Sequence, residues 1–220
     1  MLMDFTELFR TLYGVDQPQG CTDAEIDAVK EIFGALPAVV ETFWRAVGRT
    51  KKLNQGQDTW FLPEDYSKWK WLRECGYLVL LNENQGVCRA GIRREDLTLP
   101  DPPVYTYVDQ KDWVLSAPTT SEFLEAALLY EAVFTFPYTP EDFMHWLSEE
   151  DMEAVQNRMT RRTVLKDWFD MDITCYQNRP DNLLAVLDVG GGEFQAIFGG
   201  TTQEGYAAML EAMDGLGEPL

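Results

Sequence analysis

The chain has 220 residues, of which 45% are hydrophobic and 13% aromatic, so it can bury a substantial core as one large domain or two small ones. Its formal net charge of −19 argues against binding to nucleic acid or to an anionic membrane, because contacts with phosphates need clustered Lys and Arg. A basic protein is the natural partner of such a chain, although surplus acid also serves solubility alone.

The cysteines form no C-x-x-C pair, which argues against a zinc knuckle and a dithiol redox motif; they are Cys21, Cys75, Cys88 and Cys175. We expect four reduced thiols. Residues 1–15 place charged residues among apolar ones at helical spacing, unlike the apolar centre of a signal peptide, and no stretch approaches transmembrane length. The expected location is the cytoplasm.

Helical patterns dominate the first 50 residues. Residues 2–13 form an amphipathic segment that ends at a glycine. In the next segment Thr22 and Glu25 have the spacing of a capping box, and Gly34 can end the helix in the left-handed conformation. A third helix is predicted from Pro37 to Gly48.

Aromatic residues gather in the segment that follows a polar loop. Residues 60–62 have the composition of a short strand, and Pro63 is suited to open a helical turn that carries Tyr66, Trp69 and Trp71. Their spacing does not place all three on one side. We therefore expect Trp69, Trp71 or both to be partly exposed, where tryptophan often serves an interface.

Residues 77–97 predict a central β-hairpin. An apolar run at residues 77–81 is followed by the turn residues 82–86 and by a second arm from Val87 to Ile92. Strands at residues 104–108 and 113–115 follow, and Thr119 with Glu122 caps a helix that extends to about Phe134. These elements predict a central antiparallel sheet covered by helices.

Residues 136–140, which contain two prolines, mark the predicted boundary between a domain of residues 1–136 and an extension of residues 137–220 docked on it. In the extension we predict helices that begin at Thr139 and Ser148, a meander of three strands, and a last helix capped by Thr201 and Glu204. The strands are expected at residues 172–177, 183–188 and 193–198. The fold class is therefore α+β, with a central, mostly antiparallel sheet flanked by helices and a C-terminal α+β extension.

Charge is distributed unevenly across this boundary. Residues 137–220 hold 16 acids and 5 bases, a net charge of −11, whereas residues 1–136 have a net charge of −8. If an acidic surface recruits a partner, we expect that surface in the extension.

Three motifs that suggest chemistry have simpler explanations. Residues 186–192 resemble the glycine-rich motif of S-adenosylmethionine-dependent methyltransferases, but a strand follows the glycines where a cofactor site needs a helix, so we interpret them as a hairpin turn. His145 is the only histidine, which leaves one residue for any catalytic triad and too few for an imidazole metal site. The neighbouring carboxylates at residues 95–96 and 149–151 offer acid–base chemistry, yet such residues are also expected on solvated faces and in first helical turns.

Several short motifs share the order and spacing found in the SUKH superfamily, which joins bacterial toxin-immunity proteins with fungal cell-wall assembly regulators. They are Leu36-Pro37, Phe43-Trp44, Gly48, Glu83-Asn84-Gln85-Gly86-Val87, Gly91-Ile92 and Asp101-Pro102-Pro103-Val104. The resemblance covers about residues 20 to 135, and Ala90 stands where the family often has an aromatic residue. It implies an immunity function, in which the protein binds a toxin and masks its active site.

We therefore predict a non-enzymatic protein-binding module of the immunity type, without cofactor or metal, whose partner is a protein such as a basic toxin domain. A monomer or weak dimer is expected. The candidate binding residues supply aromatic area, acids and amides: Trp69, Trp71, Glu83, Asn84, Gln85, Asp109 and Trp113. Two alternatives remain open, a small carboxylate-dependent hydrolase and a scaffold that self-associates through exposed aromatics.

Overall fold

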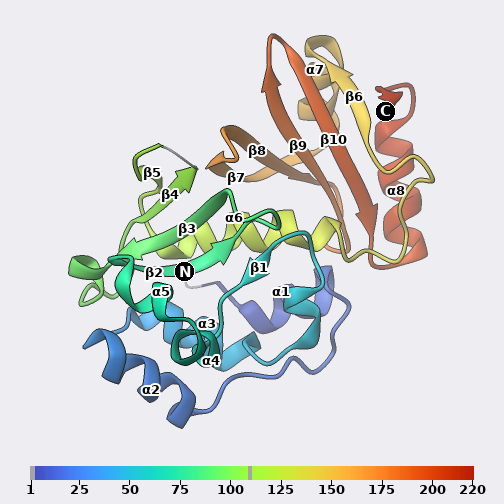
Figure 1. Ribbon diagram of the computed structural model, residues 1–220. Helices are drawn as coiled ribbons and strands as arrows, with labels where there is room; N and C mark the ends of the chain where they lie inside the picture. The colour runs from blue at the N-terminus through green and yellow to red at the C-terminus, as the bar shows by residue number, and fades with distance from the viewer. Residues whose placement is uncertain (1–2, 109–110) are drawn as a thin grey trace.

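The computed structural model describes residues 3–108 and 111–220. In these residues the chain forms eight α-helices and two antiparallel sheets, one of five strands and one of six (Figure 1). The predicted α+β class is confirmed.

The first sheet is a meander whose strands are neighbours in chain order. Its strands are β1 (Thr59–Trp60), β2 (Tyr77–Asn82), β3 (Cys88–Arg93), β4 (Val104–Val108) and β5 (Val114–Ala117). The predicted hairpin is β2–β3, in which Tyr77 lies opposite Arg93. The backbone N–H of Gly86 donates to the carbonyl of Glu83 at 2.8 Å, and Gly86 has the positive φ of 78° that this turn requires.

Helices cover one side of this sheet. They are α1 (Phe5–Leu12), α2 (Asp23–Phe33), α3 (Ala38–Val47), α4 (Pro63–Lys68) and α5 (Lys70–Glu74), with 3₁₀ turns at Lys51–Asn54 and Arg94–Asp96. The predicted capping box is present, because the Thr22 side chain accepts from the N–H of Glu25 and the Glu25 carboxylate accepts from the N–H of Thr22. Gly34 ends α2 with a φ of 86°, as predicted.

The second sheet has the strand order β11-β6-β10-β9-β8-β7. Its strands are β6 (His145–Ser148), β7 (Thr160–Trp168), β8 (Met171–Gln177), β9 (Asn182–Gly190), β10 (Glu193–Gly200) and β11 (Glu218–Pro219). The predicted meander is therefore confirmed as β8–β9–β10. Helices α7 (Glu149–Arg158) and α8 (Gln203–Met213) enclose a separate core on one face of this sheet.

The glycine run Gly190, Gly191 and Gly192 is the turn of the β9–β10 hairpin. All three residues have positive φ, and Gly190 pairs with Glu193 across the turn. A strand follows the glycines, not a helix, so the interpretation as a hairpin turn is confirmed.

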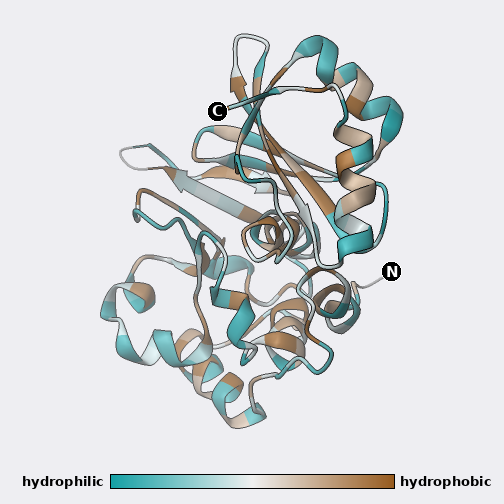
Figure 2. Cartoon of the chain, turned by 90° about the vertical axis from the view of Figure 1, so that its right-hand side faces the viewer, coloured by the Kyte–Doolittle hydropathy of each residue, from teal (hydrophilic) through white to brown (hydrophobic). Residues whose placement is uncertain are grey.

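Helix α6 (Thr120–Val133) lies between the two sheets (Figure 1). Eleven of its residues are buried, because it packs against β5 on one side and against β7 to β10 on the other. Figure 2 views this helix nearly along its axis, surrounded by hydrophobic segments. One hydrophobic core therefore includes residues from both sides of the predicted boundary at residues 136–137.

Two predictions in the extension are wrong. Residues 139–147 do not begin a helix: they form bends and then strand β6, in which Trp146 pairs with Gln195 of β10. The edge of β10 offers backbone partners to this segment, and that pairing prevails over the proline and threonine pattern of a helix start. The last helix is capped one residue later than predicted, because Thr202 accepts the hydrogen bond from the N–H of Gly205.

Candidate protein-binding surface

The outer face of the first sheet carries tyrosine and arginine side chains. On β3, Cys88, Ala90 and Ile92 are buried, whereas Arg89 and Arg93 point to the other face and are half-buried. Strand β4 alternates in the same way, with Tyr105 and Tyr107 on the outer face. Together with neighbouring aromatics they form what we call the aromatic–arginine face: Trp71, Tyr77, Arg89, Arg93, Tyr105, Tyr107 and Trp113.

The aromatic rings on this face contact one another. Tyr77 and Trp113 are stacked, with ring centroids 3.8 Å apart and planes only 9° from parallel. Tyr105 meets the edge of Tyr77 at 6.3 Å, and Tyr107 is tilted against Trp113 at 5.6 Å. Such pairs contribute about 0.5–1.5 kcal/mol each beyond the burial of area, so the cluster is ordered before any partner arrives.

Each arginine on this face lies over aromatic rings. The guanidinium carbon of Arg93 is 4.0 Å from the ring centroid of Tyr105. That of Arg89 lies 5.2 Å from the ring of Trp71 and 5.1 Å from the ring of Tyr107. These cation–π contacts hold the guanidinium groups against the rings without using their hydrogen-bonding capacity.

Neither Arg89 nor Arg93 forms a salt bridge within residues 3–108 and 111–220. Arg89 donates through one terminal nitrogen to the carbonyl of Gly86 at 3.3 Å, but its Nε is buried and has no hydrogen-bond partner in the described part of the chain. A buried donor of this kind costs free energy until an acceptor reaches it.

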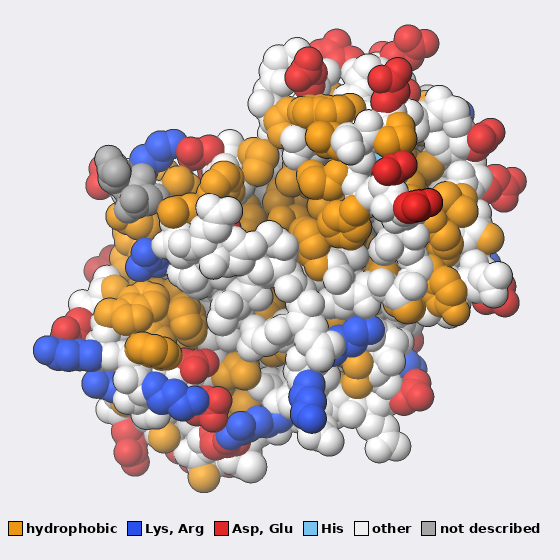
Figure 3. Space-filling model, turned by 45° about the vertical axis from the view of Figure 1, so that its right-hand side comes forward, with side chains coloured by type: hydrophobic (Ala, Val, Ile, Leu, Met, Phe, Trp, Pro, Cys, Tyr) orange, Lys and Arg blue, Asp and Glu red, His pale blue; other side chains and the backbone are white. Residues whose placement is uncertain are grey.

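The residues that supply the first half of this face are basic, whereas residues 95–113, which supply Tyr105, Tyr107 and Trp113, hold five acids and one base. Residues 68–94 hold six bases and two acids, a net charge of +4, within a chain of net charge −19. In the view of Figure 3, most Lys and Arg side chains lie on the lower part of the face, among Asp and Glu side chains, and the side chains at the top are acidic. The two charged side chains of the face, Arg89 and Arg93, are opposite in sign to the total charge of the chain.

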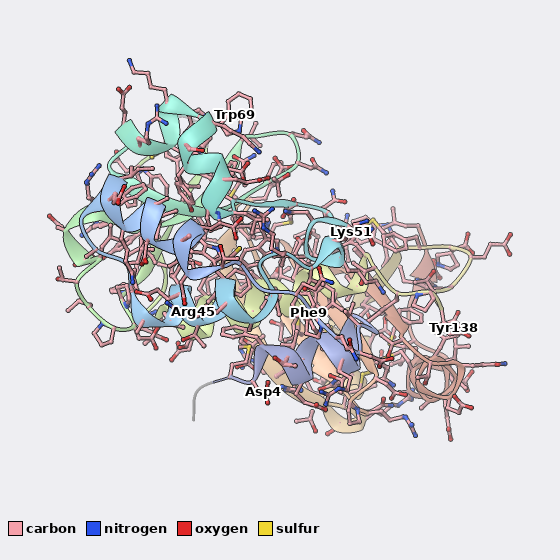
Figure 4. The ribbon with its side chains drawn as sticks, turned by 90° about the horizontal axis from the view of Figure 1, so that it is seen from below. Asp4, Phe9, Arg45, Lys51, Trp69 and Tyr138 are labelled. Atoms are coloured by element: carbon pink, nitrogen blue, oxygen red, sulfur yellow. The ribbon has the colours of Figure 1, made fainter. Side chains whose placement is uncertain are left out.

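The structure brings only some of the predicted binding residues to this surface. Trp113 lies in the cluster, and Trp71 contacts it through Arg89. Trp69 is 53% exposed and projects outward beside α4 and α5 (Figure 4). Together with Trp71 it lines an open groove of about 500 Å³ along β1. Asp109 lies outside the described residues.

The prediction of Glu83 as a surface residue is wrong. Its side chain is buried, and its carboxylate accepts hydrogen bonds from the backbone N–H of Gln85 at 2.9 Å and of Val87 at 3.4 Å. Glu83 therefore holds the hairpin turn in place, while Asn84 and Gln85 are exposed.

A group of buried polar residues supports this turn from inside. Asp58 accepts from the N–H of Asn84 at 3.1 Å and from Nε1 of Trp168 at 2.9 Å. Its own N–H donates to Oε2 of Glu131 at 3.0 Å, and Oε1 of Glu131 is buried without a partner among the described residues. The carboxyl groups of Asp58 and Glu131 thus connect three parts of the chain: the β2–β3 turn, helix α6 and strand β7.

Burial raises the pKa of Asp58 to about 6. Burial, and then the nearby charge of Asp58, raise the pKa of Glu131 to about 8. Because two carboxyl groups are buried side by side, the pair keeps a proton at a pH at which exposed carboxyl groups are ionised. Glu83 and Tyr130 also lie near this pair, and burial raises the pKa of Tyr130, which stays neutral.

We expect stability to fall as the pH rises from about 5 to 8. Both pKa values are raised on folding, so the folded chain binds more protons than the unfolded chain between the ordinary carboxyl pKa and the raised values. The contribution of Asp58 and Glu131 to the free energy of unfolding is fully present below the ordinary carboxyl pKa. It is lost as the pH rises through their raised pKa values. Urea unfolding across this range should show a steeper decline for the wild type than for Glu131→Gln.

The matched control for this prediction is Glu122→Gln, an exposed position on the same helix, which should leave the pH dependence unchanged. Equal pH dependence of the wild type and Glu131→Gln would show that Glu131 is not protonated in the folded chain.

The hydrolase hypothesis requires an open cleft with two carboxyl groups and a perturbed pKa. Asp58 and Glu131 meet the pKa condition, but both are buried, and neither lines any of five open pockets in the described part of the chain. His145, the single histidine of the sequence, lies on β6 with its ring against Phe198. These positions favour structural roles over acid–base catalysis.

Comparison with known proteins gives no match to a family model, to a curated protein or to a solved structure. In the described part of the chain no helix combines the length and hydrophobicity needed to cross a membrane. Among the same residues, no three His, Cys, Asp or Glu side chains are grouped so that they could hold a metal ion.

Proposed function

We propose that this chain is a protein-binding module and that the aromatic–arginine face is its binding surface. The observation that carries the proposal is the composition of this face, where tryptophan, tyrosine and arginine gather on an ordered sheet. These three residue types dominate the energetic centres of protein interfaces. The face is half-buried in the chain alone, so a partner can complete its burial.

Neutralisation of a toxin is the form of this function that the SUKH resemblance implies. The predicted basic partner is supported by the net charge of −19 and by the acidic extension. The charged side chains of the aromatic–arginine face are arginines, opposite in sign to the net charge of the chain. The part of the partner that contacts this face can therefore differ in charge from the partner as a whole.

Loss of a central aromatic tests the proposal. We expect Trp113→Ala to reduce recovery of the partner at least about 30-fold in pull-downs from lysate of the source cell, because truncation at an interface centre costs about 2 kcal/mol or more. Quantitative mass spectrometry compares the proteins captured by the wild type and the variant.

The control is Phe143→Ala, which removes an aromatic that is 37% exposed and distant in the sequence from the face. Its captured proteins should match those of the wild type. Identical capture by the wild type and Trp113→Ala, with the variant folded by circular dichroism, would contradict the proposed surface.

A further inference from the structure

We infer that the aromatic–arginine face recognises an acidic, extended polypeptide segment of its partner. This inference rests on the proposed function and names the chemistry of the contact. It differs from the expectation that the net charge of the whole chain gives, because the charged side chains of the face are Arg89 and Arg93, and both are basic. A basic segment would be repelled at this face, whereas a carboxylate would be attracted.

Arg89 and Arg93 have the geometry for carboxylate binding. Their guanidinium carbons lie over aromatic rings, at 5.1 and 5.2 Å for Arg89 and 4.0 Å for Arg93. The rings restrict each guanidinium group, whose N–H donors suit a bidentate contact with a carboxylate. The Nε of Arg89 is buried, so the donors that Arg89 offers to a carboxylate are its terminal nitrogens.

The distance between Arg89 and Arg93 determines how far apart the acidic residues of a partner segment must be. Both lie on the same face of β3, four residues apart, which corresponds to about 13 Å at 3.3 Å per residue. Gly91 lies between them and is buried, because its Cα approaches the backbone of Leu78 and Val79 too closely for a side chain. An extended segment with acids four residues apart matches this arrangement.

A single-stranded nucleic acid fits the face less well. Its bases need free aromatic faces for stacking. Here Tyr77 and Trp113 stack on each other, and Arg93 covers one face of Tyr105. The rest of the chain also carries a large negative charge, which opposes a polyanion at long range.

Selection from a displayed library of random 12-residue peptides tests the inference. The wild-type chain is the bait, and an Arg89→Gln/Arg93→Gln variant serves for counter-selection. We expect the arginine-dependent peptides to carry Asp or Glu, preferentially at positions four residues apart. Replacing one such acid by its amide should weaken binding about 10-fold to 100-fold, the effect of one charge-assisted hydrogen bond.

The control bait is Lys51→Gln/Arg161→Gln, which removes two exposed charges outside the face and should bind the selected peptides normally. Basic peptides whose binding depends on Trp113 would overturn the inference and leave the proposed function standing. An absence of peptides that depend on Arg89, Arg93 or Trp113 would contradict both. Tighter binding of a 12-nucleotide oligothymidylate than of the best peptide would also overturn the inference.

Discussion

The Trp168→Ala variant is expected to lose about 3–5 kcal/mol of unfolding free energy. Trp168 is 2% exposed, packs in the core shared by both sheets, and donates from Nε1 to Asp58 at 2.9 Å. Its truncation leaves a cavity and removes a donor from a buried carboxylate, so both effects act in the same direction. Urea denaturation at pH 7, followed by circular dichroism, measures the loss.

Two further variants separate these effects. Trp69→Ala makes the same chemical change at a residue that is 53% exposed and should cost less than about 1 kcal/mol. Trp168→Phe keeps most of the volume but loses the hydrogen bond to Asp58, and its cost should be intermediate. Equal losses for Trp168→Ala and Trp69→Ala would contradict the placement of Trp168 at the junction of the two sheets.

The turn that carries Trp168 has a strained backbone. Asp167, Phe169 and Asp170 all have positive φ, at 53°, 56° and 62°. Non-glycine residues pay a free-energy cost in this conformation, which the surrounding contacts must offset. The contacts include the indole hydrogen bond to Asp58 and the ion pair between Lys111 and Asp170.

Reversal of both charges on β3 should have the largest effect on binding. We expect Arg89→Glu with Arg93→Glu to weaken affinity for the captured partner by at least about 100-fold, because the donors are lost and repulsion of an acidic segment replaces attraction. Surface plasmon resonance at two salt concentrations measures the change. Most of it should lie in a faster dissociation rate.

The matched control is Lys51→Glu with Arg161→Glu, which changes the net charge equally at exposed positions outside the face. It should retain affinity within a few-fold. If both double variants weaken binding to the same extent, total charge governs the interaction and the aromatic–arginine face does not.

Local signals in the sequence predicted much of the fold. The capping residues Thr22, Thr119 and Ser148 start helices as predicted, because a cap depends on residues three positions apart. The hairpin at residues 77–93 and the glycine turn at residues 190–192 are likewise local. Strands β6, β7 and β11 were not predicted, because their pairing depends on partners distant in the sequence.

The binding surface was predicted less well than the fold. The residue type of Trp71 and Trp113 predicted them as binding residues, but the arginines and tyrosines that lie between them on the face were not predicted. The alternation of Arg89 and Arg93 with buried Cys88, Ala90 and Ile92 was a usable signal for an outward face. The burial of Glu83 depends on its position beside backbone N–H groups of its own turn, which composition does not reveal.

Photocrosslinking from the aromatic–arginine face identifies the protein that contacts this face. The chain carries p-benzoylphenylalanine in place of Tyr107, or in place of the exposed Phe143 as the comparison site, and is irradiated in the source cell. The account predicts a protein crosslink from position 107 that maps to an acidic segment, and none to the same protein from position 143. A crosslink to a partner from position 143 with none from position 107 would contradict it.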